Sequence, residues 1–209
     1  MIIENRQLKV SKTARITLLQ KSERKNKKLL IALHGYGQLS TYFSRKFENI
    51  HPDYDVLVPE ALNRFYLKAS AGRVGASWMT KEEREYDIAD NLDYLHQIVQ
   101  IYSVDYEHIS LLGFSQGGAT AARYCYAFNN PFEALILWGS VFPPDVSQEK
   151  LPDFTGEKYF VLGKEDEFFN EENQKEALNL QKNLGYFTIL FDGKHDIDIP
   201  VLNEILSKL

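Results

Sequence analysis

The feature that most constrains the fold of this chain is its alternation of short apolar, β-rich runs with segments of helical periodicity. Several runs are continuously apolar, as are strands buried on both faces of a parallel sheet, and parallel strands need long crossover connections. The pattern therefore predicts an α/β fold, with a mostly parallel central sheet flanked by helices. The predicted strands are 14–20, 29–33, 55–59, 109–113, 134–138, 159–162 and 187–191.

Three segments outside these strands have strong helix signals. In residues 83–102, apolar side chains recur at spacings of three and four, so one face of a helix there is buried. A second helix is predicted from Asn170, a good N-cap, to Gly185, a good stop, and a third opens with Pro200 in its first turn. Because no repeat or composition break divides the chain, we expect one domain over 1–209 without a large cap.

Composition and charge narrow the classes of partner. Hydrophobic residues make up 44% of the chain and charged residues 25%, which is typical of soluble globular domains. The formal net charge is -5 with mixed signs, so no basic footprint for nucleic acid is present, and the locally basic stretch 21–28 is expected to be a solvated loop. The N-terminal residues are too charged for a signal peptide, and no apolar run approaches the ~20 residues of a membrane span. We expect a cytoplasmic protein without stable membrane insertion, monomeric or homodimeric, whose single Cys125 is a packed residue.

The segment Gly113-Phe114-Ser115-Gln116-Gly117-Gly118 has the pattern of a nucleophile elbow. It follows a predicted strand and precedes the Ala-rich, helix-forming run 119–128. A serine on so sharp a turn needs small residues two positions to either side, which Gly113 and Gly117 supply. The following helix directs free N–H groups and its positive dipole end toward Ser115, where a developing oxyanion would be stabilised. Ser115 is therefore predicted to be a catalytic nucleophile.

An elbow of this type predicts an acid and then a histidine on loops after later strands. His195 is the only histidine downstream of Ser115 and is the predicted general base. Asp166 follows the strand 159–162 and is the preferred orienting acid, because a short loop there still reaches the imidazole. Its competitors within the sequence are Glu165, Glu167, Asp192, Asp196 and Asp198.

The oxyanion hole of such a site needs two backbone donors. One is predicted to be the amide of Gln116, directly after the nucleophile. The other should come from the loop 34–38, where we assign Tyr36 and leave Gly37 and Gln38 as alternatives. His34 is interpreted as a residue that braces this loop. No two histidines have a zinc-ligand spacing, so we predict neither a metal nor a cofactor.

These motifs together resemble the phospholipase/carboxylesterase family of small α/β-hydrolases, which includes acyl-protein thioesterases. The resemblance covers most of the chain, from Leu29 to His195, and its most specific part is the Phe-Ser-Gln-Gly-Gly elbow. It implies an α/β-hydrolase fold and a serine hydrolase acting on carboxylic esters or thioesters. The pair Phe168-Phe169 departs from the small aliphatic residues and proline usual after the acid, and Lys194 replaces a small residue before the base.

The expected substrates are small, because only about twenty residues separate two of the predicted strands, near 138 and 159, and no helical lid fits between them. We expect an open, shallow cleft that prefers soluble esters with acyl chains of roughly two to eight carbons. Hydrolysis of another acyl bond (lysophospholipid, lactone or peptide) is the alternative, and a non-catalytic binding protein of the same fold is a weaker one. The aromatic residues expected to line the cleft are Tyr36, Trp78, Phe142, Phe168 and Phe169.

Overall fold

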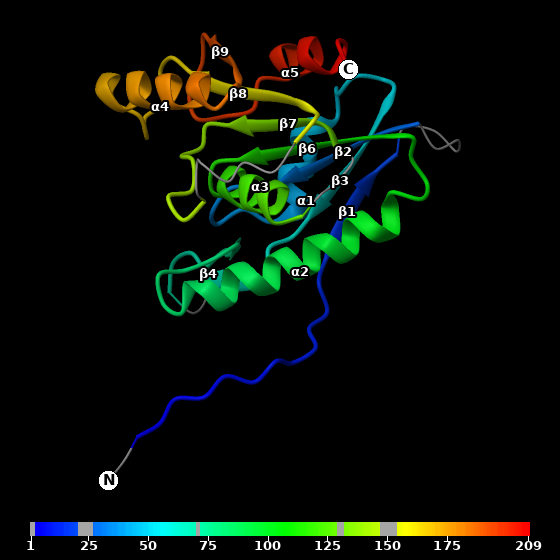
Figure 1. The fold of residues 1–209 in the computed structure, drawn as a ribbon. Helices are drawn as coiled ribbons and strands as arrows, with labels where there is room; N and C mark the ends of the chain where they lie inside the picture. Colours follow the sequence, from blue (N-terminus) through cyan, green and yellow to red (C-terminus); the bar gives the residue numbers. More distant parts are fainter. Residues whose placement is uncertain (1–2, 21–26, 70–71, 129–131, 147–153) are drawn as a thin grey trace.

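A seven-stranded sheet forms the centre of the protein in the computed structural model, which describes residues 3–20, 27–69, 72–128, 132–146 and 154–209 (Figure 1). The strand order is β1-β3-β2-β6-β7-β8-β9, and only β1 runs antiparallel to its neighbour. The predicted mostly parallel sheet is thus confirmed. Its strands are β1 (Ile16–Leu19), β2 (Lys28–Leu33), β3 (Tyr54–Pro59), β6 (His108–Phe114), β7 (Phe132–Trp138), β8 (Glu157–Gly163) and β9 (Phe187–Phe191).

Helices cover both faces of this sheet, because successive side chains of a strand point to opposite sides. On one face, Leu29 and Ile31 of β2 join a core built with α2 (Arg84–Tyr102), α3 (Gln116–Ala127) and α4 (Glu171–Asn183). On the other face, Leu30 and Ala32 pack in a second core formed with three shorter elements. These elements are α1 (Ser40–Phe43), the 3-10 helix η1 (Ser44–Phe47) and α5 (Ile199–Leu206).

The predicted helix ends have local physical causes. Asn170 caps α4 by accepting a 2.8 Å hydrogen bond from the backbone N–H of Asn173. After the same helix, Gly185 adopts a φ of 79°, a left-handed conformation that favours glycine. Pro200 lies in the first turn of α5, behind the N-cap Asp198.

The sequence analysis did not predict a small hairpin made of β4 (Asn63–Tyr66) and β5 (Val74–Ser77). These short strands pair with each other and form a sheet separate from the central one. Each strand has only four residues, which is too short for a clear alternation of polar and apolar side chains. A single bridge between Gln38 and Ala76 attaches the hairpin to the loop after β2.

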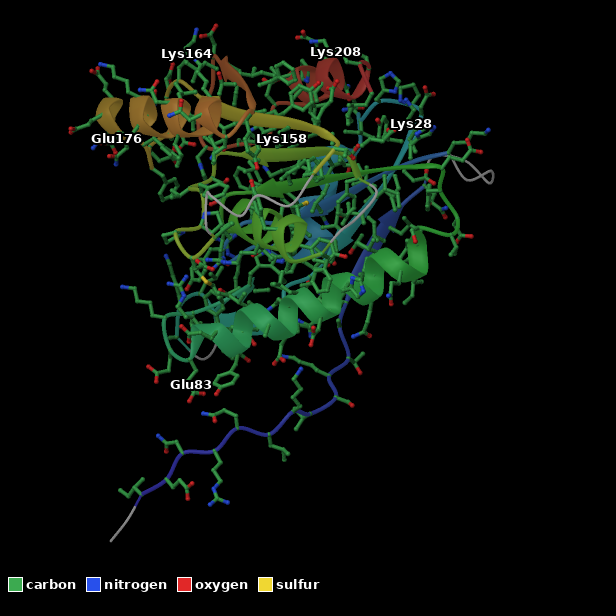
Figure 2. All side chains as sticks on the ribbon, in the orientation of Figure 1. Lys28, Glu83, Lys158, Lys164, Glu176 and Lys208 are labelled. Carbon is green, nitrogen blue, oxygen red and sulfur yellow. The ribbon has the colours of Figure 1, made fainter. Side chains whose placement is uncertain are left out.

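The described part of the segment between β7 and β8 contains no helix, in line with the predicted absence of a large cap; residues 147–153 lie outside the described residues. Residues 21–26, most of the predicted basic loop, also lie outside them. Among the described residues, no helix combines the length and apolarity that crossing a bilayer requires. Charged side chains of both signs, such as Lys164, Glu176 and Lys208, extend outward from the C-terminal half (Figure 2).

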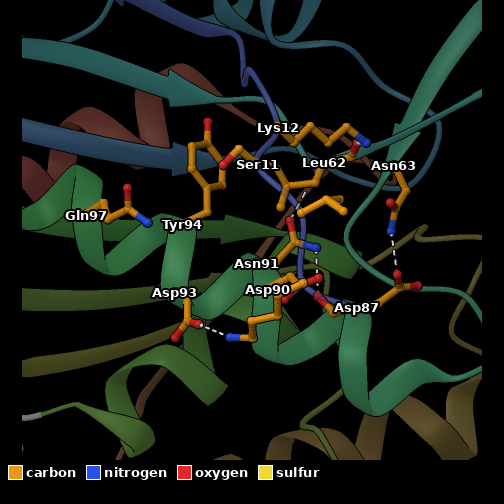
Figure 3. Close-up of a pocket in the computed structure, with 12 residues that line it drawn as sticks. Ser11, Lys12, Leu62, Asn63, Asp87, Asp90, Asn91, Asp93, Tyr94 and Gln97 are labelled. Atoms are coloured by element: carbon orange, nitrogen blue, oxygen red, sulfur yellow. Dashed lines mark hydrogen bonds and ion pairs between the residues drawn. The ribbon is translucent and has the colours of Figure 1, made fainter. Parts of the chain in front are cut away.

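The N-terminal segment before β1 runs away from the sheet (Figure 1). Near residues 9–12 it borders a pocket of about 430 Å³ with Leu62, Asn63 and the exposed side of α2 (Figure 3). An ion pair of 3.0 Å between Lys9 and Asp93 crosses this pocket. The pocket includes none of the predicted catalytic residues.

Candidate active site

Ser115 lies on a strained turn between β6 and α3. Its φ is 54° and its ψ is -120°, a conformation that costs a non-glycine residue on the order of 1–3 kcal/mol. Two backbone hydrogen bonds hold the turn: the Ser115 N–H donates to the Trp138 carbonyl at 2.9 Å, and the Gly118 N–H donates to the Ser115 carbonyl at 2.9 Å. This geometry is that of a nucleophile elbow, which presents a side chain at the carboxyl edge of the sheet.

The two glycines that flank the elbow are required by close backbone contacts. A Cβ added at Gly113 would lie 2.4 Å from the carbonyl oxygen of Gly117. One added at Gly117 would lie 2.4 Å from the carbonyl oxygen of Leu33, at the end of β2. Larger side chains at either position would push the elbow away from the neighbouring strand end.

The structure brings Asp166 and His195 together from the loops after β8 and β9. The Asp166 carboxylate accepts a hydrogen bond of 2.7 Å from Nδ1 of His195, and its other oxygen accepts one of 3.0 Å from the backbone N–H of Phe168. Asp166 is fully buried, while the His195 side chain is 11% exposed. Because Nδ1 faces the carboxylate, Nε2 of His195 is the nitrogen left to exchange protons with a substrate.

Four of the five acidic residues that competed with Asp166 have other partners. Glu167 accepts a bond of 3.4 Å from the His195 backbone rather than from its ring. Asp192 pairs with Lys164, Asp196 pairs with Lys46, and Asp198 caps α5. Among the described residues, Asp166 is the only acid that hydrogen-bonds to the His195 ring.

The His195 ring packs between two aromatic side chains. Its centroid lies 4.8 Å from that of Phe114, the residue before Ser115, and 4.5 Å from that of Phe168. His195 and Ser115 therefore share one edge of the sheet. The Ser115 hydroxyl makes no hydrogen bond to any residue that the structure describes, and such contacts in ligand-free enzymes often tighten only when substrate binds.

Hydrogen bonding within the loop 34–38 singles out one amide as a free donor. The Gly35 N–H donates to the Gln38 side chain at 2.9 Å, the Gly37 N–H to the Ala76 carbonyl at 2.8 Å, and the Gln38 N–H to the Gly35 carbonyl at 3.2 Å. Tyr36 has no such partner among the described residues. The N–H of Gln116, at the first position of α3, has no partner within the helix. These two amides are available to a bound oxyanion.

A buried polar network supports this loop from below. His34 is fully buried; its Nε2 accepts the Ala61 N–H at 3.0 Å, so the proton is on Nδ1, which donates to the Gly35 carbonyl at 2.7 Å. Burial lowers the pKa of His34 to about 4, which keeps the ring neutral near pH 7. The network confirms that His34 braces the loop.

The aromatic residues expected to line the cleft fall into two groups. Trp78, Phe142 and Phe169 are 1%, 6% and 8% exposed and belong to the main core, so they offer little surface to an open cleft, and their contact with a substrate stays a prediction. Trp78 is held inward because its indole donates to the His34 carbonyl at 2.8 Å, and Phe142 packs against Tyr126 at 5.7 Å. Tyr36 and Phe168 are 59% and 69% exposed and remain available to a substrate.

Trp138 is a residue that the sequence analysis used only to mark a strand end. Its carbonyl accepts the Ser115 N–H, and its buried indole donates to the Asp196 carbonyl at 2.8 Å, one residue after His195. One residue thus joins the nucleophile turn, through its carbonyl, to the histidine loop, through its side chain. No sequence pattern signals this contact, because the two bonded residues are 58 positions apart.

Other side chains place limits on the chemistry. Cys125 is buried, and burial raises the pKa of its thiol well above the usual range, so this cysteine is a packed residue as predicted. No group of three or more His, Cys, Asp or Glu within the described ranges is arranged to hold a metal ion.

Comparisons with known proteins place this geometry in context. The family model described as Phospholipase/Carboxylesterase matches residues 14–208, and no curated protein matches the chain. Among solved structures, acyl-protein thioesterase 2 of Zea mays is 15% identical, with a TM-score of 0.71 over 94% of this chain and 97% of that one. A Bacillus cereus carboxylesterase is 16% identical, with a TM-score of 0.67 over 93% and 92% of the two chains. At such identities the likeness shows a shared fold, the α/β-hydrolase fold.

Proposed function

The chain belongs to the phospholipase/carboxylesterase family, and from that premise we propose that it is a serine hydrolase that cleaves carboxylic esters or thioesters of small acyl substrates. The observation that carries the proposal is the bond of 2.7 Å between buried Asp166 and His195, at the same sheet edge as the strained Ser115 turn. A carboxylate that orients a histidine beside a serine on such a turn is the arrangement that activates a hydroxyl nucleophile.

In the proposed acylation step, Oγ of Ser115 attacks the carbonyl carbon of the substrate while Nε2 of His195 takes the hydroxyl proton. The carbonyl oxygen becomes an oxyanion, which the amides of Tyr36 and Gln116 stabilise. The bond from carbon to the leaving alcohol or thiol then breaks. His195 returns the proton to that leaving group, and the acyl group stays on Ser115.

Deacylation repeats the sequence with water. His195 removes one proton from the water as its oxygen attacks the acyl carbon, and the tetrahedral species collapses when its bond to Ser115 breaks. The proton on Nε2 returns to Oγ, which releases a carboxylic acid and the free enzyme. Asp166 stays ionised throughout, holding Nδ1–H and stabilising the imidazolium in both steps.

Substrate size follows from the exposed surface around the site. Tyr36 and Phe168 are exposed, Phe168 packs against His195, and the described residues after β7 supply no helical lid. These features support small soluble acyl groups over lipid at an interface. The structures of similar fold include proteins named for thioester and for carboxylic ester hydrolysis, so both bonds belong in the proposal.

A covalent serine probe tests the proposal directly. A fluorophosphonate should label the wild-type chain at one site, and Ser115→Ala should remove the label and lower the hydrolysis of p-nitrophenyl acetate by several orders of magnitude. Ser207→Ala, at an exposed serine after α5, is the matched control and should be labelled like the wild type. Normal labelling of the Ser115→Ala variant would exclude Ser115 as nucleophile.

A further inference from the structure

A groove of about 720 Å³ lies beside the candidate oxyanion loop, outside the set of residues assigned to catalysis. Three parts of the chain form it: the loop after β2, the segment of α1 and η1, and the described hairpin residues Leu67, Arg73 and Val74. The bridge between Gln38 and Ala76 joins the loop to the hairpin, with bonds of 2.8 and 3.1 Å. The lining residues are Gly37, Gln38, Leu39, Tyr42, Phe43, Lys46, Leu67, Arg73 and Val74.

The groove lies near the candidate catalytic serine, although Ser115 is not among its lining residues. A Cβ at Gly35 would lie 3.2 Å from Cβ of Ser115, and Gly37, two residues later, already lines the groove. At its other side Lys46 pairs with Asp196, the residue after His195. A small molecule whose carbonyl sits at Ser115 can therefore extend into this space.

Apolar side chains from all three segments line the groove while remaining open to solvent. Tyr42 from α1, Leu67 from the turn after β4 and Val74 from β5 are each more than a third exposed. Because covering such surface removes it from water, the groove favours an aliphatic or aromatic portion of a ligand.

Positively charged side chains lie beside these apolar ones. Lys46 and Arg73 line the groove, and the Arg45 guanidinium lies 5.1 Å from the centre of the Tyr42 ring. Asp196 compensates the charge of Lys46. The exposed Arg73 side chain has no hydrogen bond or ion pair with any residue in the described ranges. The chain as a whole has a net charge of -5, so the positive charge is a local property of this groove. Such a local charge favours negatively charged ligands.

We propose that this groove selects esters in which a short apolar segment separates the scissile carbonyl from a negatively charged group. Arg73 would receive that anion, a carboxylate or a phosphate, since its guanidinium offers paired N–H donors of matching geometry. The inference rests on the proposed function, because it assigns a substrate class to the same serine. It adds a charge requirement that the catalytic residues do not impose.

The negative charge of such an ester lies either on its acyl part or on its alcohol part. Two pairs of substrates, each a charged ester and a neutral one, distinguish these two cases. The acyl pair is the p-nitrophenyl monoester of adipic acid against p-nitrophenyl hexanoate. The alcohol pair is 4-acetoxybenzoate against its methyl ester. For each pair, the measured quantity is the ratio of kcat/KM for the charged ester to that for the neutral ester. We expect this ratio to exceed one in one of the two pairs.

Removing the cation should lower that ratio. Arg73→Gln is expected to reduce it about three- to tenfold, Arg73→Glu is expected to reduce it further, and added salt should reduce it in the wild type. Lys175→Gln is the matched control, because Lys175 is an exposed cation on α4, which contributes no residue to the groove. The control should keep the wild-type ratio.

The possible results distinguish a failure of this inference from a failure of the proposed function. Hydrolysis of neutral esters with no preference for the charged member of either pair would overturn this inference and leave the proposed function intact. Equal effects of Arg73→Gln and Lys175→Gln would also overturn it, since the selectivity would then reflect overall charge. Failure to hydrolyse any of the four esters, with no labelling of Ser115, would overturn the proposed function and this inference with it.

Discussion

Two buried tryptophans anchor opposite sides of the candidate site, and their surroundings differ. Trp138 donates its indole N–H to the Asp196 carbonyl at 2.8 Å on the histidine side. Trp78 donates to the His34 carbonyl at the same distance on the oxyanion side. Trp138 is part of β7 in the central sheet, whereas Trp78 follows β5 of the separate hairpin.

This difference shows that separate parts of the fold hold the two sides of the candidate site in place. On the histidine side, Ser115, Asp166 and His195 lie within a few residues of the ends of β6, β8 and β9, so their positions follow from the parallel sheet itself. On the oxyanion side, a side chain holds the segment after β5: the side-chain amide of Gln116 accepts a hydrogen bond of 3.0 Å from the backbone N–H of Trp78 and donates one of 3.0 Å to the Met79 carbonyl. The positions of the proposed catalytic residues therefore depend on the central sheet. The surface proposed to contact the substrate depends in part on the β4–β5 hairpin.

The largest effect should come from the histidine side. Asp166→Asn is expected to preserve the fold and lower kcat about 10³- to 10⁴-fold, because the amide favours the wrong histidine tautomer. Glu165→Gln and Glu167→Gln are the matched controls and should lower kcat far less. If either control were more damaging than Asp166→Asn, the assignment of the acid would be wrong. Steady-state kinetics with circular dichroism as a check on folding is the measurement.

The next effect concerns stability and belongs to the oxyanion side. His34 has a pKa of about 4 in the folded protein against 6.5 as its ordinary value, so between these pH values the unfolded chain binds one more proton. Lowering the pH across this window therefore favours unfolding, and the full contribution, about 3 kcal/mol, is present above pH 6.5.

Urea unfolding at pH 7 and at pH 4.5 measures this contribution. His34→Gln should be less stable at pH 7 but should lose less free energy of unfolding on acidification than the wild type. His51→Gln, at a half-buried histidine outside the network, is the control and should retain the wild-type dependence. An equal pH dependence of wild type and His34→Gln would contradict the buried neutral role of His34.

The two tryptophans give an intermediate effect that sharpens the comparison. Trp138→Phe keeps an aromatic ring but leaves the Asp196 carbonyl without its donor, a loss of about 0.5–1.5 kcal/mol. We expect kcat to fall about tenfold with little change in KM. The fall should be greater for alkyl esters than for p-nitrophenyl esters, because a poor leaving group needs the proton that His195 delivers.

Trp78→Phe is the counterpart on the other side. It removes the donor to the His34 carbonyl, so we expect a similar loss that affects alkyl and p-nitrophenyl esters equally, because the oxyanion forms with both. If both variants had the same dependence on the leaving group, the division between a proton-transfer side and an oxyanion side would fail.

The smallest effect should come from an exposed aromatic. Phe168 packs on His195 at 4.5 Å and is otherwise open to solvent, so Phe168→Ala should widen the cleft. We expect kcat/KM for octanoyl over butyryl esters to rise about two- to fivefold. Phe187→Ala, at an exposed phenylalanine on the edge strand β9, is the control and should leave the acyl-chain preference unchanged.

The sequence by itself predicted the features that short segments encode. Continuous apolar runs predicted the parallel strands, and residues such as Asn170, Gly185 and Pro200 predicted helix ends from their own conformational preferences. The glycines around Ser115 predicted the elbow for the same reason, because the backbone there comes too close to itself for any side chain. Each of these signals depends on a few neighbouring residues, so the sequence contains it however the distant segments pack.

Only the tertiary structure decided which aromatic residues are buried and which are exposed. An aromatic ring suits a core and a cleft wall equally well, so composition could not separate Trp78 and Phe142, which are buried, from Tyr36 and Phe168, which are exposed. The hairpin, the free Tyr36 amide and the bond from Trp138 to the histidine loop also depend on partners far away in the sequence. Burial and hydrogen bonding between distant segments arise only when the strands and helices pack, and for that reason local pattern does not contain them.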